Sequence, residues 1–330
     1  MSSTKVRVVA GVVLAASLLV ACGDDDDDVA TTGDAATDDT TTTTAGDDAG
    51  GDDTAEDDTS DTTAAGGDGS GDGEMTEAAA CAADAGTVSE GVLTIGTDTP
   101  AFPPWFQDDD PTNGEGFESA VAYAVAGELG FAADAVTWTI VPFNNAFAPG
   151  EKDFDFDINQ VSITAEREEV VDFSDGYYDV NQALVGYEDS AAVGATTVAE
   201  LQGLQLGAQV GTTSLDFITE VIQPESEPLV YNDNSAAKAA LDAGQVDGIV
   251  LDLPTAFYVS AVEIEGSAVI GQFPSVGDEP EQFGMVFEDG NPLRDCVNQA
   301  LAALDESGQL DAIEQEWLAE ATGAPVIEVG

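Results

Sequence analysis

The sequence predicts an α/β protein whose body forms two lobes joined by two crossing strands. Short runs rich in β-branched and aromatic residues alternate with helical patterns along the chain, and this alternation is typical of parallel βα units. The chain has 330 residues, and the body of about 250 residues that follows a low-complexity segment suffices for two lobes of ordinary size. Two extended segments, 183–187 and 283–287, are expected to carry the chain from the first lobe to the second and back.

The first lobe is expected to hold three strands, one long helix and a short helical turn. The strands are expected at 92–96, 136–141 and 154–158, the helix at 118–129 and the turn after Phe143. Apolar residues spaced to form one face indicate the helix: Phe117, Val121, Val125 and Leu129. The strand at 154–158 is indicated by its strict alternation of apolar and acidic residues.

The second lobe is expected to alternate strands and helices in the same way. Its strands are expected at 204–209 and 246–251, and its helices near 197–201, from 213 onward, at 235–243 and at 254–262. The closing helices at 292–305 and 310–319 are assigned to the first lobe, which then comprises 81–184 and 285–330 and leaves 185–284 to the second lobe. Because ligands of open α/β folds lie at the carboxyl ends of strands, we expect the ligand site in a cleft between the lobes.

Residues 1–22 have the pattern of an export signal. Lys5 and Arg7 precede an apolar run at 8–20 that is too short to span a bilayer and suits a signal peptide. The run ends in Leu-Val-Ala-Cys, which resembles the lipobox of bacterial lipoproteins and implies that Cys22 is lipidated. The protein would then lie outside the cytoplasm, anchored to the cell membrane by this lipid. An ordinary signal peptide with an incidental cysteine is the alternative.

The next segment, 23–80, consists mainly of Asp, Thr, Gly, Ala and Ser, and it contains no Lys, Arg, Pro or aromatic residue. Such a composition buries too little apolar surface to offset the entropy of ordering, so we expect a disordered acidic tether. A tether would hold the body away from the membrane. An acidic tail that binds a partner is the alternative.

The charge balance excludes several functional classes. The chain has six Lys and Arg against 66 Asp and Glu, a formal net charge of −60, and a body this poor in cations is not expected to bind nucleic acid. The chain contains no His, which removes the commonest general base and a common metal ligand. We therefore expect no enzymatic activity, no metal and no other cofactor.

One segment, 162–178, carries most of the functional signal. It reads Ser-Ile-Thr-Ala-Glu-Arg-Glu-Glu-Val-Val-Asp-Phe-Ser-Asp-Gly-Tyr-Tyr, with Arg167 near its centre. A guanidinium group can hold a carboxylate by two parallel hydrogen bonds. The alternative is a surface arginine paired with a neighbouring glutamate such as Glu166 or Glu168.

The segment resembles the signature of the family 3 solute-binding proteins, the polar amino-acid receptors of ABC importers. Four further stretches resemble family landmarks in the right order: 96–106, with Phe102-Pro103-Pro104-Trp105-Phe106, then Gly116-Phe117-Glu118, Gln209-Val210-Gly211-Thr212-Thr213 and 246–252. The resemblance covers roughly 92–318. It implies the type II periplasmic-binding-protein fold and a monomer that captures an amino acid by hinge closure and delivers it to an ABC permease. A ligand-sensing or dehydratase-like catalytic member of the same fold is the alternative.

The resemblance also implies roles for individual residues. The ligand carboxylate would bind Arg167, Thr212 and Thr213, and the ammonium group would bind Asp252, Gln160 and Ser162; Asp98, Phe102, Trp105 and Phe143 would form the side-chain pocket. The threonines and Asp252 are alternatively helix caps, the aromatic residues plain core, and Asp98 a turn cap. Gln160 contributes either its backbone alone or also its side chain. Because no second cation accompanies Arg167 in these motifs, we expect a neutral polar or cationic amino acid as the ligand.

Two cysteines remain after Cys22, and an even pair in an exported protein indicates a disulfide. Cys81 precedes the first strand, and Cys296 lies in the helix expected at 292–305. Metal binding or a reactive thiol would be the alternative, but companion His and Cys residues are lacking. We therefore expect a Cys81–Cys296 bond that pins the end of the tether to the first lobe.

Overall fold

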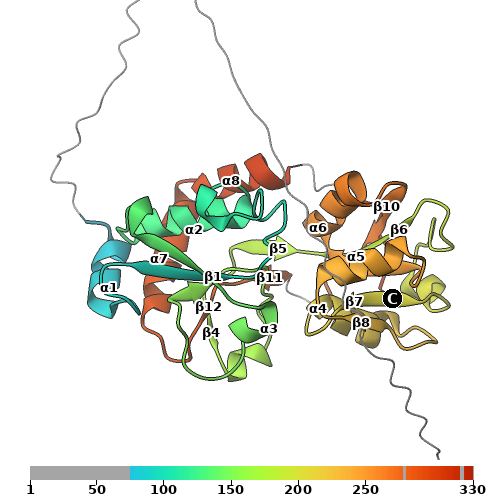
Figure 1. Ribbon diagram of the computed structural model, residues 1–330, viewed down its shortest axis with the longest axis horizontal. Coiled ribbons are helices and arrows are strands. Elements are labelled where there is room, and N and C mark those ends of the chain that lie inside the picture. Colours follow the sequence, from blue (N-terminus) through green and yellow to red (C-terminus); the bar gives the residue numbers. More distant parts are fainter. Residues whose placement is uncertain (1–74, 278–279, 320–322, 330) are drawn as a thin grey trace, which may run out of the picture. The chain divides into compact units, whose positions relative to one another are not determined.

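The computed structural model describes residues 75–277, 280–319 and 323–329. The expected export signal, the lipidation site Cys22 and nearly all of the expected tether therefore lie outside the described residues. The described part confirms the two-lobed α/β fold: it contains two separate five-stranded sheets with the strand orders β2-β1-β3-β12-β4 and β10-β6-β9-β7-β8 (Figure 1). Within this part, no helix has the length and apolar character needed to cross a membrane.

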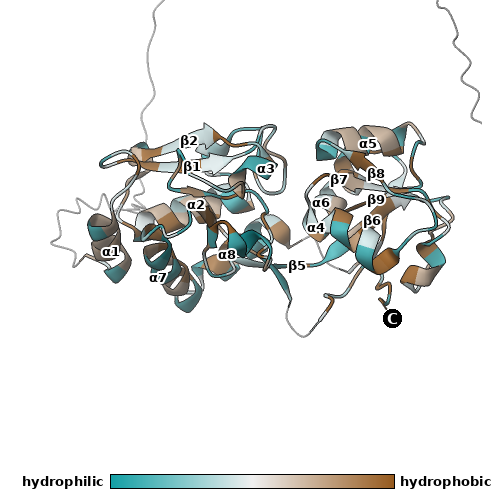
Figure 2. Cartoon of the chain, turned by 90° about the horizontal axis from the view of Figure 1, so that it is seen from below, coloured by the Kyte–Doolittle hydropathy of each residue, from teal (hydrophilic) through white to brown (hydrophobic). Residues whose placement is uncertain are grey.

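The first lobe is built on a mixed sheet covered by helices. Its strands are β1 (Leu93–Thr97), β2 (Val136–Ile140), β3 (Phe156–Asp157), β4 (Asp172–Phe173) and β12 (Val286–Phe287), and its longer helices are α1 (Glu77–Ala85), α2 (Phe117–Glu128), α7 (Leu293–Glu306) and α8 (Gln309–Leu318). β1 pairs in parallel with β2 and β3, whereas β12 is antiparallel to β3 and β4. The apolar faces of the helices share one core with the sheet, and α7 accordingly carries both hydrophilic and hydrophobic residues (Figure 2).

The second lobe has the same construction. Its strands are β6 (Gln182–Tyr187), β7 (Leu206–Gln209), β8 (Leu229–Tyr231), β9 (Gly248–Asp252) and β10 (Ser267–Gln272), and its helices are α4 (Thr213–Asp216), α5 (Asn234–Asp242) and α6 (Leu253–Tyr258). π-Helical segments, Phe217–Ile222 and Val259–Glu263, extend α4 and α6. β7 is parallel to β8 and β9, so these strands end at the same edge of the sheet.

Short helical turns complete the described chain. They are α3 (Phe143–Ala146) and the 3₁₀ turns Pro111–Asn113, Ala133–Ala135, Arg167–Glu169 and Val198–Leu201. The turn after Phe143 and the helical segment near 197–201 were both expected from the sequence.

The chain crosses between the lobes at β5 (Tyr178–Val180) and β11 (Glu281–Phe283), which pair antiparallel in a small sheet of their own. The predicted crossings at 183–187 and 283–287 were placed a few residues too late. Ala183, Leu184 and Val185 are fully buried in β6, so this apolar run is a central strand of the second lobe. Similarly, β12 already belongs to the first sheet.

The end of the described chain returns to the second lobe, although 285–330 was expected in the first. Val326 and Glu328 form bridges to Gln272 and Thr197, and Ile327 is fully buried in the second-lobe core. A side chain at Gly271 would collide with Ile327, so the glycine admits this close packing. The sequence of a short apolar stretch after the last helix does not indicate which lobe the stretch packs against.

Helix α1 begins inside the range expected to be tether. Thr76 caps it by accepting a hydrogen bond from the amide of Ala79 (3.0 Å), and its alanines pack on the first lobe. The predicted disulfide is confirmed: Cys81 of α1 is bonded to Cys296 of α7, with Cα atoms 5.4 Å apart. Thus helical structure begins several residues before Cys81.

Candidate functional site

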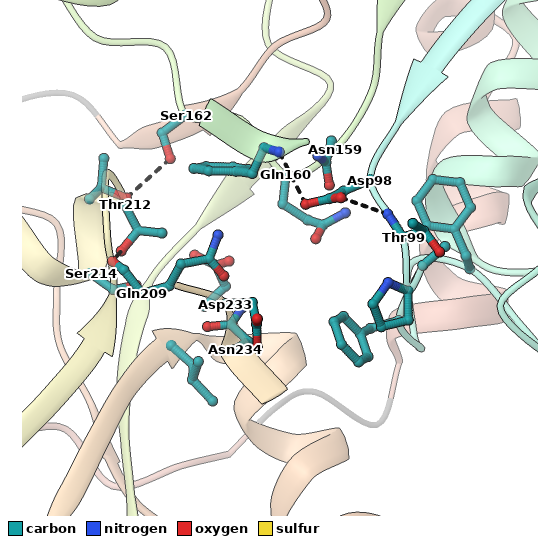
Figure 3. A pocket seen from close by; sticks show the side chains of 18 of the residues that line it. Asp98, Thr99, Asn159, Gln160, Ser162, Gln209, Thr212, Ser214, Asp233 and Asn234 are labelled. Carbon is teal, nitrogen blue, oxygen red and sulfur yellow. Dashed lines mark hydrogen bonds between the residues drawn. The ribbon is translucent and has the colours of Figure 1, made fainter. Parts of the chain in front are cut away.

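A pocket lies between the lobes, at the strand ends where the sequence analysis expected a cleft (Figure 3). It is lined by nine of the ten residues for which a ligand contact was expected: Asp98, Phe102, Phe143, Gln160, Ser162 and Arg167 from the first lobe, and Thr212, Thr213 and Asp252 from the second. Trp105 is not among the lining residues, and Phe106 lines the pocket instead. The structure thus brings together residues separated by more than 150 positions in sequence.

Arg167 is buried at the pocket, with 8% of its surface exposed. One of its Nη atoms donates to the carbonyl of Ser162 (2.5 Å) and the other to the carbonyl of Gly211 in the second lobe (2.9 Å). Its guanidinium carbon lies 4.4 Å from the ring centre of Phe147. No described carboxylate forms an ion pair with it, so the alternative of a surface arginine paired with neighbouring glutamates is wrong. Burial lowers the pKa of Arg167, but a guanidinium keeps its charge in proteins.

The turn before α4 brings two hydroxyl groups to the pocket. The Thr212 side chain accepts from the amide of Leu215 (3.2 Å) and donates to the carbonyl of Gln209 (2.8 Å), so its hydroxyl caps the helix. The hydroxyl of Thr213 lies 3.3 Å from that of Ser162 on the facing lobe. Gly211 has a φ of +75°, and a side chain there would collide with Asn144 of the first lobe. The glycine therefore permits the lobes to approach closely.

Asp252 ends β9 and presents a carboxylate to the pocket. Although it is the N-terminal cap residue of α6, its side chain makes no capping hydrogen bond. One carboxylate oxygen accepts from Nε2 of Gln182 (3.2 Å). Burial, helped by the nearby charge of Glu281, raises the pKa of Asp252 to about 8. An added cation would favour its ionised form, which makes the carboxylate a suitable acceptor for an ammonium group.

A polar network at the crossing strands was missed by sequence reasoning. Gln182 donates through Nε2 to both Asp252 (3.2 Å) and Glu281 (3.1 Å), and Glu281 also accepts from the hydroxyl of Ser162 (2.6 Å). The hydroxyl of Ser214 donates to Oε1 of Gln182 (2.6 Å). The network joins the pocket to the hinge, because Gln182 begins β6 and Glu281 begins β11. A polar residue one or two positions before each expected crossing was its only trace in the sequence.

Gln160 is held by Glu118, which the sequence analysis treated only as the start of a helix. Gln160 has a φ of +49°, and its amide N–H donates to Oε1 of Glu118 (2.7 Å). The side-chain amide of Gln160 donates to Oε2 of Glu118, and the hydroxyl of Tyr177 donates to Oε1. Glu118 is fully buried, and burial raises its pKa to about 7. The side chain of Gln160 is therefore bonded to Glu118, and Gln160 also lines the pocket.

The assignment of Trp105 to the side-chain pocket was wrong. Its indole is fully buried in the first-lobe core, edge-on to Phe117, Tyr178 and Phe283, and its Nε1 donates to the hydroxyl of Thr255 (2.8 Å). The proline-rich turn at 100–104 brings Phe102 to the pocket. Phe106 borders the pocket as well, but like Trp105 it is buried in the first-lobe core. Aromatic identity alone did not distinguish these three positions.

Asp98 caps the turn that follows it, which was the alternative role expected from the sequence. Its two carboxylate oxygens accept from the amides of Thr99 (2.7 Å) and Phe143 (3.0 Å), as the dashed lines in Figure 3 show. It thereby fixes the position of Phe143 while lining the pocket. From the second lobe, Asp233 and Asn234 also line the pocket, and neither was predicted. Asp233 caps α5 by accepting from the amide of Ala236 (2.8 Å).

Two lysines lie near the site without lining it. Nζ of Lys152 donates to the carbonyls of Asn145 and Ala148. Nζ of Lys238 lies 4.2 Å from the ring centre of Phe102, and it forms an ion pair with Glu263 (2.6 Å). Among the lining residues Arg167 is therefore the sole Lys or Arg side chain. Within the described ranges, no group of three or more His, Cys, Asp or Glu side chains is arranged to hold a metal ion.

Comparison with known proteins identifies the family. Residues 93–320 match the model of the bacterial extracellular solute-binding proteins, family 3. The chain belongs to this family. It is 29% identical over 231 residues to the L-cystine-binding protein TcyJ of Escherichia coli, covering 69% of this chain and 82% of that protein. It is 25% identical over 233 residues to the arginine-binding extracellular protein ArtP of Bacillus subtilis, covering 68% and 85%.

Solved structures agree with this assignment. An ancestral arginine-binding protein bound to arginine superimposes with a TM-score of 0.59 at 28% identity, covering 69% of this chain and 99% of that one. Another neighbour is an ancestral amino-acid-binding protein described as a precursor of cyclohexadienyl dehydratase, with a TM-score of 0.56 at 26% identity. This family 3 solute-binding protein therefore has amino-acid-binding proteins among its relatives in both sequence and structure.

Proposed function

We propose that this family 3 solute-binding protein captures a free amino acid between its lobes and delivers it to the permease of an ABC importer. The amino acid would be held by its two charged groups. Its carboxylate would bind Arg167, with help from Thr213. Its ammonium group would bind Asp252 and the backbone of Gln160.

The observation that carries this proposal is the placement of opposite charges on opposite sides of one pocket. Arg167 comes from the first lobe, whereas Asp252 comes from the second lobe. No described carboxylate forms an ion pair with Arg167. A zwitterion has the matching pair of charges, and it contacts both only when the lobes are together. Binding would therefore favour the closed arrangement, as in other hinged receptors.

The pocket favours a neutral polar or cationic side chain. Besides Arg167, its charged lining residues are all acidic, namely Asp98, Asp233 and Asp252. A second ligand carboxylate would have no cationic partner there, and burying it unpaired would be costly. The relatives reported above bind L-cystine and arginine.

We further propose that the protein acts as a monomer outside the cytoplasm. A lipid on Cys22 would anchor it to the membrane, and the acidic segment that precedes α1 would act as the tether. The role of a receptor requires no chemistry on the ligand, so we expect no turnover of any bound amino acid.

A thermal-shift and calorimetric screen of the twenty amino acids and L-cystine tests the proposed function. We expect at least one of them to raise the unfolding temperature of the wild-type protein and to bind with a stoichiometry of one. The bound compound should be recovered unchanged by NMR after prolonged incubation. Binding of none of these compounds would contradict the assignment as an amino-acid receptor, and formation of a product would favour the catalytic alternative.

A further inference from the structure

The conformation of Gln160 requires support from its surroundings. Its φ of +49° lies in the left-handed region, which is unfavourable for a residue with a side chain and common only for glycine. Gln160 lines the pocket, and in the proposed function its backbone binds the ligand's ammonium group. Strained backbone of this kind persists at functional sites when neighbouring groups hold it in place.

Glu118 supplies that support through both of its oxygens. Its Oε1 accepts from the backbone N–H of Gln160 (2.7 Å), and its Oε2 accepts from the side-chain amide of the same residue. A single carboxylate thus fixes the backbone and the side chain of Gln160 together. The hydroxyl of Tyr177 also donates to Oε1. Tyr177 directly precedes β5, so the same carboxylate connects the pocket with the start of a crossing strand.

Burying the carboxylate of Glu118 is unfavourable for the stability of the folded protein. It lies in the first turn of α2, directly after the core residue Phe117, and neither residue has measurable exposure. A buried carboxylate loses its hydration, and an apolar residue in a core is often no less stabilising. A purely structural role is therefore a poor explanation for a carboxylate here. A role in holding Gln160 accounts for it, because the two donors of Gln160 both require an acceptor.

We propose that Glu118 is a positioning residue for the ligand site: it clamps Gln160 so that the backbone of this residue is set for the ligand's ammonium group and its side chain is held in one position at the pocket wall. This inference rests on the proposed amino-acid binding and adds a residue to it. Glu118 acts through Gln160 and need not touch the ligand itself. The clamp works because three donors converge on one carboxylate, whose ionised form is an acceptor at every lone pair.

Burial opposes that ionised form. Asp157 and Asp252 both lie within electrostatic range of Glu118. Burial raises the pKa of Glu118 to about 7, although the hydrogen bonds from Tyr177 and Gln160 lower it. If Oε2 were protonated, it would face the side-chain amide of Gln160 as a second donor, and the hydrogen bond between them would be lost. The clamp is consequently expected to loosen as the pH falls below about 7.

A reciprocal exchange of the two side chains tests the clamp. Glu118→Gln keeps the size of the side chain but places an amide donor opposite the Gln160 amide. Gln160→Glu alone places two carboxylates face to face. The double variant Glu118→Gln/Gln160→Glu restores one donor and one acceptor with the overall charge unchanged. Each protein is titrated calorimetrically with L-arginine, L-glutamine and L-cystine, and its unfolding is followed by circular dichroism.

We expect Glu118→Gln to weaken binding about 10- to 100-fold, the range for losing a hydrogen bond to a charged group. Gln160→Glu should weaken it at least as much, and the double variant should recover most of the loss. A merely structural role would not produce this recovery. If Glu118→Gln binds within about twofold of the wild type, or if the double variant is no better than the worse single variant, the clamp is refuted.

A second readout does not depend on the ligand. In wild-type protein, the backbone amide resonance of Gln160 should shift with a midpoint near pH 7, because its hydrogen-bond acceptor titrates there. In Glu118→Gln this titration should disappear. A Gln160 amide that titrates equally in both proteins would contradict the inference. Failure of the wild-type protein to bind any of the twenty amino acids or L-cystine would instead count against the proposed function, and the NMR titration would still decide whether the clamp exists.

Discussion

Arg167 differs from Arg294 and Lys238 in what surrounds it. Arg294 is paired with Asp172 and Asp295, and Lys238 with Glu263, whereas Arg167 donates to two carbonyl groups and stacks on Phe147. Burying a cation without an ionic partner is unfavourable unless the site gains an anion during function. The residue is therefore the best point at which to test the site.

Arg167→Ala should abolish high-affinity amino-acid binding. Truncating one partner of a buried charge pair costs about 2–5 kcal/mol, which corresponds to roughly 30- to several-thousand-fold in affinity. Arg167→Lys should restore little, because an ammonium group cannot form the two parallel hydrogen bonds of a guanidinium. Isothermal calorimetry measures both. Arg294→Ala is the matched control, since Arg294 is not among the residues lining the pocket, and it should bind like the wild type. Wild-type affinity in Arg167→Ala would overturn the site.

Asp252 should make binding depend on pH. In the free protein its pKa is raised to about 8 by burial, so at pH 7 it is mostly protonated, whereas an ammonium ligand requires the carboxylate. Affinity should therefore rise about tenfold between pH 6 and pH 7 and level off above pH 8, with release of most of a proton at pH 7. Calorimetry in buffers with different ionisation enthalpies measures the released proton.

The same shift predicts the effect of pH on the stability of the free protein. The folded pKa of Asp252 lies above its unfolded value of 3.8, so the folded state holds a proton that the unfolded state has lost. The free energy of unfolding should thus fall as the pH rises from about 4 to about 8. Because Glu118 also titrates in this pH range, the Asp252→Asn variant is needed as a control that isolates the contribution of Asp252.

The same variant serves as the control for the binding experiment. It should not release the proton on binding, and a release as large as in the wild type would exclude Asp252 as the source.

The residues that line the pocket were largely predictable, but their supporting partners were not. Arg167, Thr213 and Asp252 occupy fixed places in motifs, and the strand ends bring them together. Glu118 and Glu281 act through hydrogen bonds to residues 42 and 119 positions away, and such pairings leave no local pattern. Trp105 was misplaced because a proline-rich turn decides which of its aromatic residues face the core.

Secondary-structure elements with strong periodicity were predicted well. α2, α5 and α7 lie within a residue or two of their expected ranges, since each has an apolar face that must be buried. β8 and β10 were missed. β8 is short and mostly exposed, and β10 carries a bulge between Val269 and Gly271, so neither shows a clear period of two. α1 was missed because its composition continues that of the preceding low-complexity segment.

The bond between α1 and α7 should contribute substantially to stability. α1 buries only alanines and the side of Cys81, so its own packing is modest, while the disulfide spans 215 residues of sequence. Closing so long a loop typically stabilises a protein by about 2–4 kcal/mol, and the double variant Cys81→Ser/Cys296→Ser should unfold about 5–15 °C lower. Calorimetric unfolding tests this. Neither helix lines the pocket, so ligand affinity should be unchanged. An unaltered unfolding temperature would show that the bond does not stabilise the lobe.

Lys238 on α5 should help to hold the lobes together. Its ammonium group lies 4.2 Å from the ring centre of Phe102 on the other lobe, and Glu263 orients it. A cation–π contact contributes about 0.5–2 kcal/mol, so Lys238→Met should weaken binding roughly two- to thirtyfold. The loss should lie in faster dissociation and be similar for every ligand, because Lys238 does not line the pocket. Stopped-flow fluorescence gives the dissociation rate, and an effect confined to one class of ligand would contradict a role in closure.

The net negative charge of the chain affects which amino acids it attracts as ligands. The formal net charge of −60 attracts cations at long range, but salt screens such fields within about 8–10 Å. Selectivity must then come mainly from the pocket, where Arg167 is the one lining cation and would be occupied by the ligand's α-carboxylate. Lys152 is bonded to two backbone carbonyls, and Lys238 is paired with Glu263. The side-chain carboxylate of glutamate would accordingly remain unpaired.

Glutamate and aspartate should therefore bind more weakly than glutamine, arginine or lysine. The comparison of glutamate with glutamine is the sharpest, because the two differ little in shape and the amide does not carry the desolvation penalty of a charge. Competition calorimetry at two salt concentrations separates the causes. A preference for glutamine over glutamate that persists at high salt comes from the pocket, whereas an advantage of arginine that shrinks with salt comes from the long-range field. Glutamate ranking first would mean that a lysine moves into the pocket on binding, and Lys152→Met and Lys238→Met would then identify which one.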